Sequence, residues 1–277
     1  MNKHLRDLPF VVLHILLFLS MVNTAKAQSD SNYNEPTHSF KFSTQIGNNL
    51  IQNGRKQAKN QLYFRPSFMY YHISGFYLGT YITTIPGDKK NPLDNIRWNT
   101  GYDYDIGDHL TIGIDYSYSQ YYTTKQVTSS APHCVMLSAS WYAKLITPSI
   151  YEIMNLGSTN DYTTNFDLSH VFIKKQFLKT TGKLSIPINI GTYYGTSNYY
   201  STYAKKNKLT DKKGKPLPLN SVTTTSKQFT SFYASATIKY KISKFAISAN
   251  LTITNQLVQN KYVTQTPVWR VLLSYYF

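Results

Sequence analysis

We single out nine charged residues on the polar faces of segments in which apolar and polar residues otherwise alternate along this 277-residue chain. Side chains two positions apart point to the same face of a strand, so these residues share the polar faces of their segments. Opposite charges on such faces can form a structural ion-pair network, or they can line a selective pore. The mixture of signs favours the network. The nine residues are Lys41, Arg65, Arg97, Asp103, Asp115, Glu152, Asp167, Lys239 and Arg270.

A second group of charges lies in the long stretch between residues 195 and 226. Its middle part, 205–219, has little apolar content and cannot bury enough surface to fold alone. We expect a mobile loop that concentrates anions, and folding back onto the acidic residues named above is the alternative. No stacking sheet or recognised fold accompanies these basic residues, so we expect no nucleic-acid partner. The lysines are Lys205, Lys206, Lys208, Lys212, Lys213 and Lys215.

The elements that must position these residues are strands. Alternation with a period of two dominates from residue 40 onward, in segments of roughly the 9–11 residues that a tilted transmembrane strand needs. Turn residues separate the segments. We predict twelve strands, at 38–48, 61–71, 75–84, 93–104, 109–122, 133–144, 147–157, 163–174, 183–194, 227–241, 245–257 and 269–277.

The segment 147–157 is the least regular of the twelve. We assign Tyr151 and Ile153 to its outward face, and the only reason is that this choice places Glu152 inside. The same choice leaves Ile150 and Met154 on the inward face.

The predicted connections alternate in length. Short turns at 72–75, 105–108 and 242–244 contrast with long connections such as 49–60 and 195–226. Membrane barrels have short periplasmic turns at one rim and longer loops at the other. An even number of strands then leaves both ends of the barrel in the periplasm.

The last nine residues form the most informative stretch. One face of Trp269–Phe277 carries only apolar or aromatic residues, and the chain ends on the aromatic residue itself. This pattern resembles the closing strand of bacterial outer-membrane β-barrels, in which it is the signal read by the barrel-assembly machinery. The resemblance implies that Tyr275 and Phe277 belong to an insertion signal and that this machinery is a partner.

The N-terminus has the features of a secretory signal. Lys3 and Arg6 precede an apolar run over 10–22, and Ala25-Lys-Ala27 matches a cleavage site. We therefore predict a signal peptide at 1–27, a periplasmic lead-in at 28–37 and an outer-membrane β-barrel at 38–277. The single cysteine, Cys134, excludes an internal disulfide, and we interpret it as an unreactive thiol in the wall.

The composition distinguishes this prediction from a secreted β-sandwich, which would show the same alternation. Only 15% of residues are charged, whereas 15% are aromatic. Aromatic residues gather at the ends of the predicted strands, as in Tyr70-Tyr71 and Trp141-Tyr142, and they match the interfacial girdles of a membrane barrel. The predicted fold is an all-β, transmembrane antiparallel up-and-down barrel of about 12 strands.

Three functions are compatible with this fold. The leading hypothesis is a small channel or passive transport protein in the cell outer membrane. The second is a closed barrel whose basic loops bind lipopolysaccharide, surface glycan or a partner, and the net charge of +16 suits anionic outer-membrane lipid. The third is an outer-membrane barrel enzyme. The oligomeric state is left open by the sequence.

The sequence gives little support to catalysis. A triad needs a nucleophile, a histidine and an acid at hydrogen-bond distance. No histidine lies in the His-x-Ser-Asn-Gly motif of outer-membrane phospholipases, and neither G-x-S-x-G nor H-E-x-x-H occurs. We expect no enzyme activity, no metal and no cofactor. The histidines beyond the predicted signal peptide are His38, His72, His109, His133 and His170.

Overall fold

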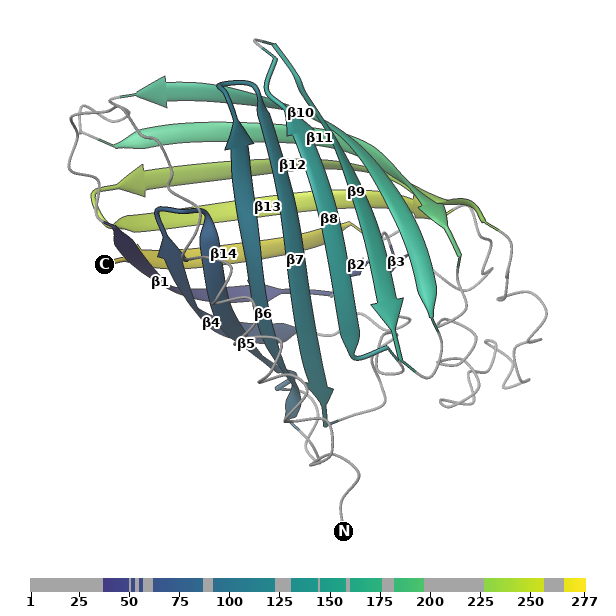
Figure 1. The fold of residues 1–277 in the computed structure, drawn as a ribbon. Helices are drawn as coiled ribbons and strands as arrows, with labels where there is room; N and C mark the ends of the chain where they lie inside the picture. Colours follow the sequence, from purple (N-terminus) through teal and green to yellow (C-terminus); the bar gives the residue numbers. More distant parts are fainter. Residues whose placement is uncertain are drawn as a thin grey trace. The chain divides into compact units, whose positions relative to one another are not determined.

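The fold is a closed barrel of twelve antiparallel strands, accompanied by one two-stranded sheet (Figure 1). The computed structural model describes residues 37–49, 51–52, 55–56, 62–86, 92–122, 131–143, 145–157, 160–175, 182–196, 227–256 and 267–277. Among these residues there is no helix long and apolar enough to cross a membrane. The barrel strands are β1 (His38–Gly47), β4 (Tyr63–His72), β5 (Phe76–Thr84), β6 (Leu93–Ile106), β7 (Leu110–Tyr121), β8 (His133–Trp141), β9 (Thr147–Leu156), β10 (Asp161–Lys175), β11 (Lys183–Gly195), β12 (Gln228–Ile242), β13 (Phe245–Gln256) and β14 (Val268–Tyr276), and the small sheet pairs β2 (Ile51–Gln52) with β3 (Arg55–Lys56).

The predicted barrel of about twelve strands is confirmed. Three predicted features lie outside the described residues. These are the signal peptide at 1–27, nearly all of the lead-in at 28–37, and the lysine-rich stretch at 205–215.

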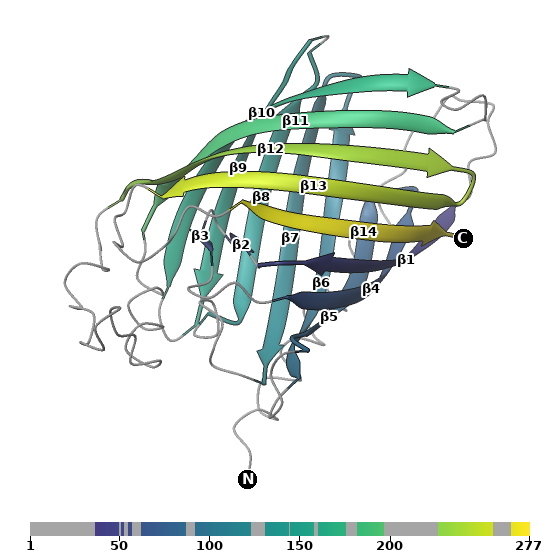
Figure 2. The ribbon, with the colours of Figure 1, turned by 180° about the vertical axis from the view of Figure 1, so that it is seen from behind.

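The barrel closes through its first and last strands. Each barrel strand pairs with its neighbours in the chain, and β14 pairs back onto β1 from Lys41↔Tyr276 to Gly47↔Arg270. The backbone N–H of Phe277 donates to the carbonyl of Phe40 at 2.9 Å, so the final residue extends the seam. Figure 2 shows β14 between β13 and β1. Closure matters because a lipid-facing sheet edge would leave backbone groups without hydrogen bonds.

The barrel wall is apolar on its outer face and polar on its inner face, the reverse of the arrangement in a soluble protein. Large apolar side chains point outward and are exposed, for example Ile114 at 40% and Leu251 at 48%. The inward positions of the same strands are mainly polar, and Ser43, Ser117 and Ser274 are buried there. An apolar exterior around a polar interior is the pattern of outer-membrane barrels.

Strand β9 contradicts the prediction made for its faces. Its register with β8 pairs Met136 with Ile153 and Leu137 with Glu152. Ile153 is therefore inward and 8% exposed, whereas Glu152 lies on the outward face. The prediction of an inward Glu152 was wrong, because the pairing with the two neighbouring strands fixes the register. A shift of one residue moves every side chain of a strand to the other face.

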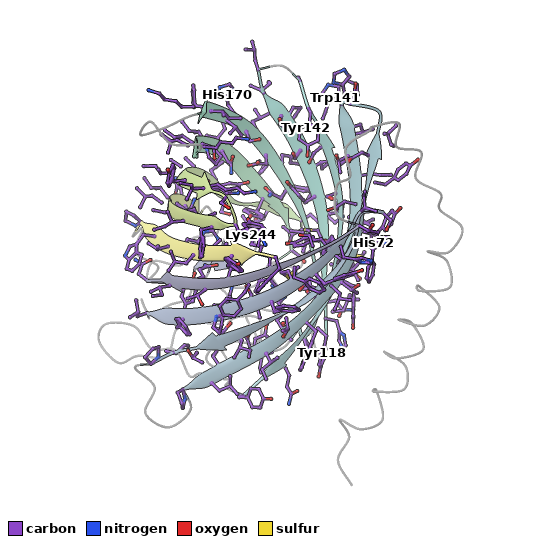
Figure 3. All side chains as sticks on the ribbon, turned by 90° about the vertical axis from the view of Figure 1, so that its left-hand side faces the viewer. His72, Tyr118, Trp141, Tyr142, His170 and Lys244 are labelled. Atoms are coloured by element: carbon purple, nitrogen blue, oxygen red, sulfur yellow. The ribbon has the colours of Figure 1, made fainter. Side chains whose placement is uncertain are left out.

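The short turns gather at one end of the barrel. Gly75 and Gly107 have positive φ angles of 95° and 60° in two of these turns. At Gly75 a Cβ atom would also collide with the carbonyl oxygen of Asp103, so glycine is needed there on two grounds. Figure 3 faces this end, and Trp141 and His72 are among the labelled side chains around its rim.

Inward tyrosines lie against glycines of neighbouring strands. Tyr63 is paired with Gly47, and a Cβ on that glycine would be 2.8 Å from the Tyr63 hydroxyl. Tyr233 is paired with Gly191, where the corresponding distance is 2.6 Å. The missing side chain lets each ring lie along the wall, an arrangement known as aromatic rescue of glycine.

The alternation predicts that an arginine destabilises the barrel more on the outward face of β13 than on its inward face. Leu251→Arg should destabilise the folded barrel by about 2–4 kcal/mol, because it places a charge in lipid near the middle of the strand. Thr252→Arg should cost less, because residue 252 faces the lumen. Urea unfolding in lipid vesicles measures both values, and a larger cost at residue 252 would show that the register is shifted.

The contact between glycine and tyrosine predicts a cost for Gly191→Ala. The new methyl group would collide with the Tyr233 ring and with the carbonyl oxygen of Phe166, and it would lower the free energy of unfolding by about 1–3 kcal/mol. In a Tyr233→Ala background the same substitution should cost less, because the ring is gone. Equal costs in both backgrounds, measured by urea unfolding, would rule out this contact as the cause.

Candidate functional site: the inward wall of the barrel

The strand registers place eight of the nine predicted charged residues on the inward face. Glu152 is the exception, as described above. Each of the eight alternates with outward apolar residues, as Arg97 does between Ile96 and Trp98. Within the described residues none of the eight forms an ion pair, so the structure gives no support to an ion-pair network. The eight residues are Lys41, Arg65, Arg97, Asp103, Asp115, Asp167, Lys239 and Arg270.

Three arginines form an arginine cluster, made of Arg65, Arg97 and Arg270, toward the end of the barrel opposite the short turns. Arg65 Nε donates to Thr83 Oγ1 at 3.0 Å, and its guanidinium lies 5.3 Å from the centre of the Tyr63 ring. Arg97 Nη2 donates to Ser117 Oγ at 2.8 Å. Both Arg97 and Arg270 act on Arg65 as like charges. Among the described residues the hydrogen-bond partners of Arg65 and Arg97 are neutral, so no carboxylate contacts the cluster there, although Asp115 attracts Arg97 at longer range.

A lysine cluster, made of Lys41, Lys239 and Lys241, lies toward the short-turn end on β1 and β12. Lys41 Nζ and Lys241 Nζ lie 5.7 Å and 4.8 Å from the centre of the Tyr276 ring. Lys239 acts on Lys41 as a like charge. The ring provides a cation–π contact for the two ammonium groups, but it does not neutralise them.

A carboxylate cluster, made of Asp103, Asp105 and Asp115, lies on β6 and β7. The hydroxyl of Tyr77 donates to Asp115 Oδ2 at 3.1 Å, and the hydroxyl of Thr111 donates to Asp105. Asp105 and Asp115 both act on Asp103 as like charges. Asp103 and Asp105 stand near the short-turn end of β6, three strands around the barrel from β1.

Asp167 is held apart from these clusters on β10. The hydroxyl of Tyr233 donates to Asp167 Oδ1 at 2.5 Å, and the same hydroxyl accepts a bond from Asn165 Nδ2 at 3.4 Å. Two inward carboxylates, Asp115 and Asp167, therefore accept hydrogen bonds from tyrosine hydroxyls. The sequence had suggested basic side chains as their partners. Among the described residues the charges of the wall form groups of like sign without contact ion pairs, although Arg97 lies close enough to Asp115 to attract it.

Sequence reasoning missed several residues of this wall. Lys241 and Asp105 continue the alternation of Lys239 and Asp103, and they were passed over because they stand at strand ends. The roles of Tyr77 and Tyr233 had no sequence signal apart from their inward positions. Each contacts a carboxylate two strands away, and only the curvature and stagger of the barrel bring such groups together.

Two histidines near the short-turn end form hydrogen bonds with hydroxyl groups. His38 Nδ1 and the Tyr70 hydroxyl are 2.7 Å apart, and His72 Nδ1 and Ser74 Oγ are 2.8 Å apart. His72 has no hydrogen bond to a carboxylate within the described chain, so this Ser–His pair is not a triad. In the same residues no three His, Cys, Asp or Glu side chains gather as a metal site. Cys134 faces inward, opposite Ser117, and is half-buried.

The chain matches no family model and no curated protein sequence. Solved structures match its fold. The "KdgM porin" is 12% identical, with 86% of this chain and 99% of that chain covered and a TM-score of 0.50. The "NanC porin" is 10% identical, with 84% and 98% covered and a TM-score of 0.48. An outer membrane channel from Pseudomonas putida F1 is 10% identical, with 91% and 100% covered and a TM-score of 0.45. The predicted resemblance to outer-membrane β-barrels is confirmed at the level of the fold.

Proposed function

We propose that the protein is a passive outer-membrane channel for small polar solutes with a preference for anions. The observation that carries this proposal is the arginine cluster. Arg65, Arg97 and Arg270 point into the barrel, and the hydrogen-bond partners of Arg65 and Arg97 among the described residues are neutral hydroxyls. A solute that enters the barrel therefore meets guanidinium groups that are not already bound to carboxylates.

Inward charges near both ends of the barrel are accessible to solvent, whereas Arg65, within the wall, is desolvated. Arg270 is exposed near one end of the barrel, and Asp103 and Lys241 are exposed toward the other. Inward serines bond to one another along the wall, as do the buried Ser43 and Ser67 at 2.7 Å, so the wall between the charges is polar. A barrel of this strand number is intermediate between small barrels filled by side chains and wide porins.

The chemistry of guanidinium groups explains the preference for anions. A guanidinium presents a rigid fork of donors that matches carboxylate and phosphate oxygens. Arg65 uses Nε for Thr83, and among the described residues its two terminal nitrogens have no hydrogen-bond partner, so they could bind a solute. Uncancelled positive charge in a narrow lumen raises the local concentration of anions. Contacts at several weak sites also let the solute leave, as conduction requires.

A closed barrel and a barrel enzyme are the competing functions. The lysine-rich stretch at 205–215, on which the closed-barrel hypothesis mainly rests, lies outside the described residues, so the structure does not test that hypothesis there. The solved structures quoted above are channels, and the described histidines complete no triad. We therefore infer that the protein is not an enzyme.

Ion selectivity tests the proposal in planar bilayers. Wild-type protein should give conductance steps, and its reversal potential in a KCl gradient should indicate a preference for chloride. Replacing Arg65, Arg97 and Arg270 by glutamine should lower the chloride-to-potassium permeability ratio by about tenfold, equivalent to about 1.4 kcal/mol of lost attraction. The control is Lys174→Gln, which removes one positive charge from the outward face.

Two outcomes would reject parts of the proposal. Folded wild-type protein without conductance would reject the channel and favour a closed barrel. A conducting triple variant with unchanged selectivity would reject the role of the arginine cluster alone.

A further inference from the structure

Glu152 interrupts the apolar exterior of the barrel near the middle of a strand. It is the sixth residue of the ten in β9, it is exposed, and it pairs laterally with Leu137 and Thr164. Exposed apolar side chains surround it, including Ile150 at 38% and Phe166 at 46%. Its depth therefore corresponds to the hydrocarbon region of the membrane.

Among the described residues, the one hydrogen-bond partner of this carboxylate is a hydroxyl. Thr164 Oγ1 lies 2.9 Å from one carboxylate oxygen and 3.1 Å from the other, and its single proton can be donated to only one of them at a time. A carboxylate has about four acceptor sites, and lipid chains offer no donor for the others. Polar groups in such positions are costly and associate with other polar groups where these are available.

The charges of the described strands restrict what the partner can be. Outward His38, His133 and Lys174 lie toward strand ends, and His170 lies on β10 six residues along the strand from Thr164. Copies of the barrel enter the membrane in one orientation, so residues of equal depth meet. The basic side chains of a second copy would therefore not reach Glu152, but the Glu152 of that copy would. Two carboxyl groups at short distance share one proton, because both cannot ionise together.

We propose that the outward face of β8, β9 and β10 is a homodimer interface in the membrane, centred on Glu152 and Thr164. The occupant of this face is a second copy related by a two-fold axis along the membrane normal, the commonest symmetry of homo-oligomers. One protonated Glu152 donates to the ionised Glu152 of the other copy, and each accepts from its own Thr164. The pair then carries one negative charge instead of two, and it is shielded from lipid by the apolar side chains around it. This proposal does not depend on the function of the lumen.

Cysteine cross-linking in lipid vesicles tests the interface with Glu152 intact. In a Cys134→Ser background, Leu137→Cys places a thiol beside Glu152, and Leu251→Cys places one on β13 at a similarly exposed outward position. A short bismaleimide should produce dimers of the first variant and at most trace amounts of dimer from the second. Absence of dimer from Leu137→Cys, or equal yields from the two variants, would overturn the proposal.

Substitution of Glu152 tests the shared proton. Glu152→Leu should abolish the dimer measured by native mass spectrometry, while heat-modifiable gel mobility reports that the barrel is folded. Glu152→Gln should keep the dimer, because amides can donate to and accept from each other. A dimer that is unaffected by Glu152→Leu, or a monomeric wild type at pH 6, would contradict the proposal.

Discussion

The pairing of β14 with β1 is the interaction on which the rest of the structure depends. A membrane gives unpaired backbone groups no water to bind, so a transmembrane sheet is stable only when it has no edge. The hydrogen bond from Phe277 to Phe40 lies at the end of this seam, next to the aromatic contact between Phe277 and Tyr275. The chain-terminal residue therefore contributes both to closure and to the apolar exterior.

Closure also determines the environment of every side chain. Once the sheet is a cylinder, one residue in two faces lipid and the next faces the lumen, so the polar residues of all strands collect in one interior. Charges of like sign then lie together on parts of the wall, because residues distant in sequence become lateral neighbours. Tyrosines that lie against glycines keep bulky rings close to the wall. The same geometry leaves the arginine cluster facing the solute path.

The sequence determined the fold, most strand positions and most faces, because each of these follows from the period of two. Leu251 and Thr252 illustrate this, since a clean alternation leaves one register for β13. The period of two gave the wrong face for Glu152, because apolar residues occupy both faces of β9 and the neighbouring strands determine its register. It also could not predict that Tyr233 binds Asp167, or that Lys41 and Lys239 lie close together. Such contacts join strands that are not sequence neighbours, or cross more than one strand, and they depend on the stagger of the closed barrel.

The central claim is that one face of each strand is wet and the other is in lipid. Accessibility of single cysteines along β13 measures this directly, in a Cys134→Ser background and in lipid vesicles. Cysteine at Ser248 or Thr252 should react with a charged, water-soluble thiol reagent through the lumen. Cysteine at Ile247 or Ala249 should not react, and a fluorophore attached there before refolding should be quenched by brominated lipid. Reactivity that shows no alternation, or alternation with the opposite phase, would contradict the account.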